Sequence, residues 1–324
     1  ARRHRRIPGQ LTPVELTLSL TGFAHSGDAL GRLEDGRACF VPFALPGETV
    51  RVRLVEETPR FVRAELLEVV TPAPARIAPR CAHFTVCGGC QLQHLPYEAQ
   101  LEAKVDLLVE QLQRLGGLDA LPLRDPVASP DPWNYRNHLQ FDLTPEGALG
   151  FHAARSNEVL AIRECHLPEP VLDELWPHLE LEPIPGLTRV SLRAGTDGDV
   201  LLTLEGTSPS PPDFEVDLPL SAVYRGPEGE VVLAGRDYVA VEVGARVFRV
   251  SAGAFFLVNT PLAEKMAAHV EGLLPDRLGT LVDLYCGGGL FSAFLAPRAG
   301  RVIGIEASPS AAGDFAANLD EFDH

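Results

Sequence analysis

The sequence has few cysteines, a single methionine, two tryptophans and no long apolar run. Six cysteines in 324 residues are too few for a disulfide-rich secreted scaffold. No apolar signal segment opens the chain, and no stretch is long enough to cross a membrane, so we expect a cytoplasmic protein without a membrane partner. In that compartment, clustered cysteines bind metal more often than they pair as disulfides.

The chain also lacks an excess of basic residues. It carries 28 Lys and Arg against 44 Asp and Glu, which gives a formal net charge of −16. Bulk charge therefore cannot hold the protein on nucleic acid, and an RNA-binding role needs local basic patches. Two such patches are the arginines in residues 1–6 and a cluster of Arg51, Arg53, Arg60 and Arg63. A solvated tail and a charged outer sheet face are the alternative interpretations.

Four of the cysteines form a pattern typical of a metal or cluster site. Cys81, Cys87 and Cys90 fall within ten residues, and Cys165 follows far downstream. Four thiolates suit either tetrahedral zinc or a 4Fe–4S cluster. His83 or His166 could replace one thiolate as a ligand, so zinc is the alternative to a cluster at this site. We predict that these cysteines hold one centre and so join two remote segments of the chain.

Residues 10–71 are predicted to form a small all-β barrel. Val14–Leu20 and Val50–Leu54 alternate apolar and polar residues, and Glu34-Asp35-Gly36 marks a turn between two strand-like runs. About five short strands in this segment fit a barrel of the oligonucleotide-binding type. Many barrels of this size bind no nucleic acid, so the pattern alone does not assign a ligand.

Residues 72–252 are predicted to form a separate central α+β domain. Three prolines in residues 71–80 indicate a linker before the cysteine run. A helix is expected at 96–115, because apolar residues recur there at spacings of three and four, and Gly116-Gly117 ends it. From 127 to 250 the pattern is β-rich with broad loops.

Residues 253–324 change to an α/β pattern. The apolar run Leu281–Leu284 leads into a glycine loop, a short helix follows, and the strand Val302–Ile305 ends at Glu306. This order is that of the nucleotide-binding half of a doubly wound sheet, in which an acidic residue after the second strand binds ribose hydroxyls.

The spacing of the glycines in this loop indicates which kind of nucleotide-containing cofactor the domain binds. Gly287-Gly288-Gly289 does not have the GxGxxG spacing of dinucleotide-binding proteins. Together with Asp283 just before the loop, it suits S-adenosyl-L-methionine better. A packing turn in some other α/β protein is the alternative interpretation.

Together these segments resemble one family, the RNA (uracil-5-)-methyltransferases that carry a TRAM barrel and an iron–sulfur cluster. The resemblance covers nearly the whole chain, and its most specific part is the cysteine motif that includes Cys87-Gly88-Gly89-Cys90-Gln91-Leu92-Gln93-His94. The other matching segments are Phe40–Glu48, Tyr135–Asn137, Leu149–Phe151, Gly253–Asn259 and Asp283–Gly289.

The resemblance implies a multidomain α/β chain. Residues 10–71 would be an OB-like TRAM barrel, 72–252 a central α+β domain with the iron–sulfur loop, and 253–324 the first part of a Rossmann-like methyltransferase domain. Cys81, Cys87, Cys90 and Cys165 would ligate a 4Fe–4S cluster, with zinc as the alternative. The residues expected at S-adenosyl-L-methionine are Asp283, Tyr285, Gly287, Gly289, Leu290, Glu306 and Leu257.

The resemblance also implies a reaction: methylation of C5 of a uridine in RNA, with 23S ribosomal RNA as the favoured substrate and a monomeric enzyme. A thiolate would add to C6 and give C5 its nucleophilic character, and the target base would leave its stack to reach the site. A catalytically inactive RNA-binding iron–sulfur protein and a cluster- or zinc-bearing redox protein are the alternative functions.

The sequence departs from the family pattern in three ways. Leu257 and Leu290 stand where the family has a glutamine and an asparagine at the cofactor. The motifs that would carry the nucleophilic cysteine and the base do not occur up to residue 324. Two parallel strands with little cover do not make a stable doubly wound domain, so we expect roughly another 80–100 residues beyond 324 and assign no catalytic residue.

Overall fold

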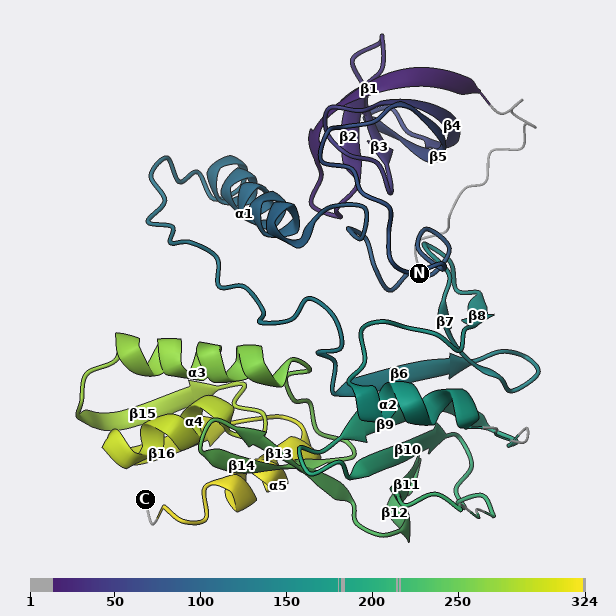
Figure 1. Cartoon of the computed structure of the whole chain (residues 1–324). Helices are drawn as coiled ribbons and strands as arrows, with labels where there is room; N and C mark the ends of the chain where they lie inside the picture. The colour runs from purple at the N-terminus through teal and green to yellow at the C-terminus, as the bar shows by residue number, and fades with distance from the viewer. Residues whose placement is uncertain (1–13, 180, 182–183, 214, 216, 323–324) are drawn as a thin grey trace. The chain divides into compact units, whose positions relative to one another are not determined.

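The computed structural model describes residues 14–179, 181, 184–213, 215 and 217–322 (Figure 1). The arginines predicted as a basic patch in residues 1–6 lie outside the described residues. The chain divides into two compact units, residues 1–127 and 128–324. The three-domain division expected from the sequence places its boundaries elsewhere and stays a prediction.

The first unit begins with a closed five-stranded barrel, which confirms the predicted TRAM-like fold. Alternation puts apolar side chains such as Leu18, Val50 and Val62 inside, where they are buried against one another. The strand order around the barrel is β1-β2-β3-β5-β4. The strands are β1 (Glu15–Phe23), β2 (Ala29–Arg32), β3 (Ala38–Val41), β4 (Thr49–Glu57) and β5 (Phe61–Thr71).

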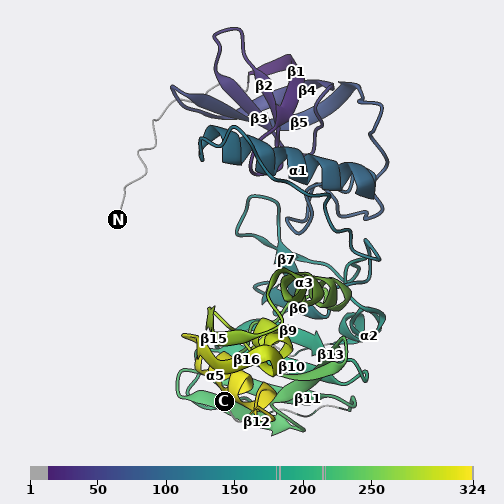
Figure 2. The same cartoon turned by 90° about the vertical axis from the view of Figure 1, so that its left-hand side faces the viewer.

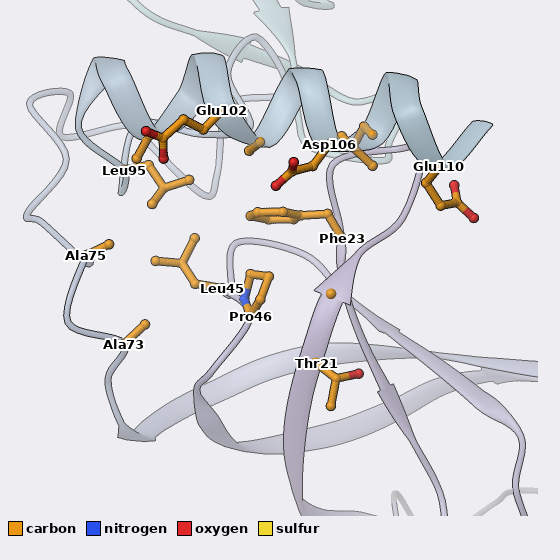
Figure 3. A pocket seen from close by; sticks show the side chains of 14 residues that line it. Thr21, Phe23, Leu45, Pro46, Ala73, Ala75, Leu95, Glu102, Asp106 and Glu110 are labelled. Atoms are coloured by element: carbon orange, nitrogen blue, oxygen red, sulfur yellow. The ribbon is translucent and has the colours of Figure 1, made fainter. Parts of the chain in front are cut away.

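After the barrel, the cysteine run lies in an irregular loop that leads to helix α1 (Tyr97–Arg114), close to the predicted 96–115. The helix lies beside the barrel (Figure 2), and its Ala99 packs near Leu45 and Leu95. Between the helix and the barrel is a pocket of about 440 Å³ into which the carboxylates of Glu102 and Asp106 point (Figure 3). An acidic pocket disfavours RNA at this place.

The second unit begins with a seven-stranded sheet whose order is β12-β11-β10-β9-β6-β7-β8. One face of the sheet packs on helix α2 (Pro170–Leu175) and the 3-10 turn η1 (Trp176–His178), where the rings of Phe141 and Trp176 stack at 5.0 Å. The strands are β6 (His138–Leu143), β7 (Leu149–His152), β8 (Val159–Ala161), β9 (Leu187–Ala194), β10 (Val200–Gly206), β11 (Ser221–Gly226) and β12 (Gly229–Ala234).

The rest of the second unit has the predicted strand, loop, helix and strand. The parallel strands β15 (Leu278–Leu284) and β16 (Ala299–Ile305) flank helix α4 (Leu290–Leu295) and the turn η2 (Ala296–Arg298). The remaining elements are the hairpin β13 (Tyr238–Val243) and β14 (Arg246–Ser251) with helices α3 (Thr260–Leu273) and α5 (Pro309–Asn318), which share one apolar core with α4. In the part of the chain that the structure describes, no helix is long and apolar enough to span a membrane.

Candidate functional site

The glycine loop after β15 is held by the end of β16. The backbone amides of Tyr285 and Cys286 both donate to the carbonyl oxygen of Ile305, at 2.8 and 3.2 Å. Tyr285 has a φ of 61°, a strained value for a bulky residue, and its side chain is 91% exposed. The loop therefore keeps an unusual backbone at the carboxyl end of a parallel strand, where ligands bind in this class of sheet.

Gly289 ends the loop at a position that requires glycine. Its φ is 87°, and a Cβ there would lie 2.6 Å from Cδ1 of Leu319. Helix α4 begins at the next residue. Gly287 also has a positive φ, of 55°, and faces open space apart from the carbonyl oxygen of Phe255. The backbone at Gly287 is therefore open to a ligand.

Glu306 closes the glycine loop through its carboxylate. One oxygen accepts from the amide of Gly287 at 3.0 Å, and the other accepts from the amides of Ala307 and Ser308, both at 2.8 Å. The amide of Ser308, followed by that of Gly287, lowers the pKa of Glu306. Because each carboxylate oxygen has two lone pairs and three of the four accept these amides, the ionised group can accept one further hydrogen bond from a ligand.

Three other residues predicted at the cofactor have partners inside the fold. Asp283 accepts a hydrogen bond of 2.7 Å from the buried hydroxyl of Ser292 on α4. Leu290 is 7% exposed in the core cluster of this unit, and Leu257 packs against the same cluster. At the two positions where the family has an amide, this chain therefore has apolar packing.

The segment Gly253–Asn259 runs beside the glycine loop and is held by Asn137, just before β6, and by Arg193 on β9. The amide nitrogen of the Asn137 side chain donates to the carbonyl of Leu257 at 3.2 Å, and a buried guanidinium nitrogen of Arg193 donates to the carbonyl of Ala254 at 3.1 Å. The segment presents the ring of Phe255, which is 74% exposed. Sequence reasoning singled out the segment and the Tyr135–Asn137 motif, but not their contact.

Sequence reasoning missed a further clamp on the glycine loop. The Asn318 side-chain amide donates to the carbonyls of Gly288 at 2.8 Å and Arg249 at 3.1 Å, and its oxygen accepts from the Arg249 amide at 2.7 Å. Nearby, buried Asp314 accepts from the amide and hydroxyl of Ser251. An asparagine at a helix end gives no sequence signal of such a role.

Replacing Asn318 with leucine is expected to lower the free energy of unfolding of the second unit by about 1–3 kcal/mol, because three backbone groups lose their partner. Urea unfolding followed by circular dichroism measures the change. The matched control is Asp320→Ala, an exposed position two residues later, where we expect a change within about 0.5 kcal/mol. Equal stability of the two variants would contradict the clamp.

The cysteine run lies in the first unit and Cys165 in the second. The sulfur of Cys81 accepts from the amide of His83, and that of Cys87 accepts from the amide of Gly89, each at 3.4 Å. Backbone N–H groups aimed at sulfur are a feature of cluster-ligating cysteines. Across the described residues, no three His, Cys, Asp or Glu side chains are gathered as in a metal site, so metal ligation stays a prediction.

Two of the four arginines considered from the sequence as a basic patch, Arg51 and Arg53, are paired with carboxylates. Arg51 pairs with Glu15 at 3.1 Å and with Glu68 at 3.0 Å, and Arg53 pairs with Glu15 at 3.2 Å and Glu65 at 3.4 Å. These pairs bridge neighbouring strands on the outer surface. The alternative interpretation, a charged outer sheet face, therefore holds for Arg51 and Arg53.

Comparison with known protein families matches two segments of the chain to family models. Residues 14–67 match the TRAM domain, and residues 215–322 match the tRNA (Uracil-5-)-methyltransferase family. A 23S rRNA (uracil(1939)-C(5))-methyltransferase from Alkalilimnicola ehrlichii is 35% identical over 94% of this chain and 72% of its own length. An uncharacterized RNA methyltransferase from Streptomyces coelicolor is 34% identical over 98% of this chain and 73% of its own.

A solved structure has the same fold. It is the tRNA (uracil-54, C5)-methyltransferase of Pyrococcus abyssi in complex with S-adenosyl-L-homocysteine, which matches 94% of this chain and 77% of its own with a TM-score of 0.69 and 22% identity. The barrel, the glycine loop and relatives above 30% identity over more than 90% of this chain all indicate the same family. This chain belongs to the RNA (uracil-5-)-methyltransferase family and carries a TRAM domain.

Proposed function

We propose that the protein transfers a methyl group from S-adenosyl-L-methionine to C5 of a uridine in 23S ribosomal RNA, as a monomer in the cytoplasm. The observation that carries the proposal is the glycine loop held by Ile305 and Glu306 beside the segment Gly253–Asn259. The relative from Alkalilimnicola ehrlichii, whose name gives a 23S uridine, supports the choice of RNA.

The cofactor would lie against the loop from Tyr285 to Gly289. Gly287 leaves room for the close approach of a nucleoside, and the one free lone pair of the Glu306 carboxylate would accept a hydrogen bond from a ribose hydroxyl. Leu290 lies in the apolar core and Leu257 packs against it, so at the cofactor site these two side chains would contribute only apolar packing. When bound, S-adenosyl-L-methionine supplies an electrophilic methyl group on a sulfonium.

The chemistry requires a thiolate, because C5 of uracil is a weak nucleophile. Addition of a cysteine thiolate at C6 would make an enolate whose C5 takes the methyl group, after which a base removes the C5 proton and the thiolate leaves. Cys286 does not suit this role, since burial, followed by the charges of Asp283 and Glu306, raises the pKa of its thiol. We assign neither nucleophile nor base within residues 1–324.

Replacing Glu306 with glutamine tests the proposed cofactor site. The amide offers one acceptor in place of two charged ones, so we expect the Kd for S-adenosyl-L-homocysteine to rise about tenfold to a hundredfold. Isothermal titration calorimetry measures it. The control is Asp320→Asn, which removes the same charge from an exposed helix end and should leave the Kd within about twofold. Unchanged binding by the Glu306 variant would refute the site.

We also propose that Cys81, Cys87, Cys90 and Cys165 hold a 4Fe–4S cluster, with zinc as the alternative. The donor set fits: four thiols, of which two already accept backbone N–H groups. Methyl transfer to an enolate moves no net electrons, so we propose that the cluster is a structural staple or a platform for RNA.

Replacing Cys87 with serine is expected to abolish cluster binding and to lower the midpoint of thermal unfolding, since a ligand and its binding free energy are lost. Metal analysis of protein purified without oxygen should give about four irons per chain for the wild type and none for the variant. Cys39→Ser, in the barrel interior, is the control that keeps the iron. Stoichiometric zinc, or iron retained by the Cys87 variant, would contradict the assignment.

A further inference from the structure

The loop of residues 81–90 is folded tightly by its own backbone. The amides of Val86 and Cys87 both donate to the carbonyl of His83, at 3.2 and 2.9 Å. Thr85, within this turn, has a φ of 80°, which is a strained value for a β-branched residue. Such strain persists only where the surroundings fix the backbone. The loop is therefore held by contacts outside itself.

The ring of Phe84 is the first of these contacts, because it anchors the loop on the barrel. Phe84 is 7% exposed, and its ring meets that of Phe43 edge to face at a centroid distance of 5.2 Å and lies 5.3 Å from that of His94. Phe43, just after β3, has a φ of 59°, and its carbonyl accepts from the guanidinium of Arg76 at 2.9 Å. Arg76 is itself paired with the buried carboxylate of Glu48. The ring of Phe84 thus rests on a fixed part of the barrel.

Gln93 is the second contact, and it holds the first cysteine of the run. It is 9% exposed, and its side-chain oxygen accepts from the amide of Cys81 at 3.1 Å. The next residue, His94, is fully buried, and a ring nitrogen donates to the carbonyl of Ala44 at 3.4 Å. The chain on both sides of the cysteine run is therefore tied to the barrel.

These contacts act on the backbone that carries the sulfur atoms. The sulfur of Cys81 already accepts from the amide of His83, and that of Cys87 from the amide of Gly89. Residues that hold the ligands of a metal are worth about tenfold to a hundredfold in metal affinity. Phe84 and Gln93 have the burial and the contacts that such residues need.

We propose that Phe84 and Gln93 are positioning residues that keep Cys81, Cys87 and Cys90 in a loop shaped before the metal arrives. This inference rests on the cluster assigned above to these cysteines. A loop that is ordered in advance loses less conformational entropy when it binds a metal. The metal is then released more slowly, and the barrel becomes part of the unit that binds it.

The test is the rate at which iron passes to a ferrous chelator from the whole chain, purified without oxygen. Gln93→Met keeps the length of the side chain but removes the acceptor, and Phe84→Leu keeps an apolar side chain but removes the ring. Each should speed the release of iron about tenfold. The matched controls should stay within about twofold: Gln113→Met, at an exposed position of α1, and Phe61→Leu, from the edge-to-face pair with Phe40 on the barrel.

Hydrogen exchange of the metal-free chain, followed by mass spectrometry, shows whether the loop is shaped without the metal. In both variants, residues 81–95 should exchange about fivefold to tenfold faster than in the wild type, while residues 14–71 should exchange at the wild-type rate. Faster exchange throughout the barrel would instead assign the two side chains to general stability and would overturn the inference.

The outcomes separate this inference from the proposals on which it rests. Iron in the wild type, with wild-type release and exchange in both variants, would overturn the inference alone. Zinc that leaves the variants faster than the wild type would support the inference and correct the metal. A wild type that holds neither metal would overturn the metal site and this inference together. Calorimetry with S-adenosyl-L-homocysteine tests the methyltransferase function separately.

Discussion

Replacing Gly289 with alanine is expected to remove cofactor binding and to lower the free energy of unfolding of the second unit by about 2–4 kcal/mol. The residue has a φ of 87°, which L side chains rarely adopt, and the new Cβ would lie 2.6 Å from Leu319 and 2.9 Å from Phe315. Both neighbours pack in the core of this unit, so the loop and not the core would move. The calorimetric signal with S-adenosyl-L-homocysteine should disappear.

The matched control is Gly313→Ala in helix α5. A Cβ at Gly313 meets nothing within 4 Å, and alanine is the better helix former. We expect a gain of about 0.5–1 kcal/mol in the free energy of unfolding and unchanged cofactor binding. A Gly289 variant that binds the cofactor like the control would mean that the loop does not approach the ligand as we describe.

Acidification from pH 7 to pH 4.5 is expected to destabilise both units. Burial lowers the pKa of His94 from 6.5 to about 4 in the first unit. In the second unit, burial and then the charges of Arg193 and Arg136 lower the pKa of His138 from 6.5 to about 3. Below pH 6.5 the two histidines are therefore protonated in the unfolded chain but remain neutral in the folded chain. The stability that the neutral histidines contribute is complete above pH 6.5 and is lost as the pH falls below it.

The size of the effect follows from proton linkage. Each histidine is expected to contribute a loss of about 2 kcal/mol in the free energy of unfolding over this range. Urea unfolding at several pH values measures it. His94→Gln should flatten the pH dependence of the first unit while leaving that of the second unit unchanged. An unchanged pH dependence in the variant would show that His94 is not buried as a neutral ring.

The sequence predicted those features that depend on local pattern. Alternation from Val14 to Leu20 predicted a barrel strand, since an interior and an exterior face impose a period of two. The order of strand, glycine loop, helix, strand and Glu306 predicted the parallel pair β15 and β16, because each step is encoded within about ten residues.

The sequence could not predict contacts between distant segments. Asn137 and Leu257 are 120 positions apart, and Asn318 and Gly288 are 30 apart, yet each pair is hydrogen-bonded. Asparagine is common in turns and helix ends, so its side chain gives no sign of a remote partner. Likewise, the sequence does not show that Arg51 is neutralised: the strand register places Glu68 opposite it, and Glu15 of the neighbouring strand pairs with it at 3.1 Å.

Mass spectrometry of 23S ribosomal RNA tests the proposed activity most directly. RNA from cells that have the gene and from cells that lack it would be digested to nucleosides and to oligonucleotides. The proposed function predicts that one 5-methyluridine disappears on deletion and returns when the wild-type gene, but not one encoding Glu306→Gln, is restored. Identical 5-methyluridine in ribosomal RNA with and without the gene would contradict it.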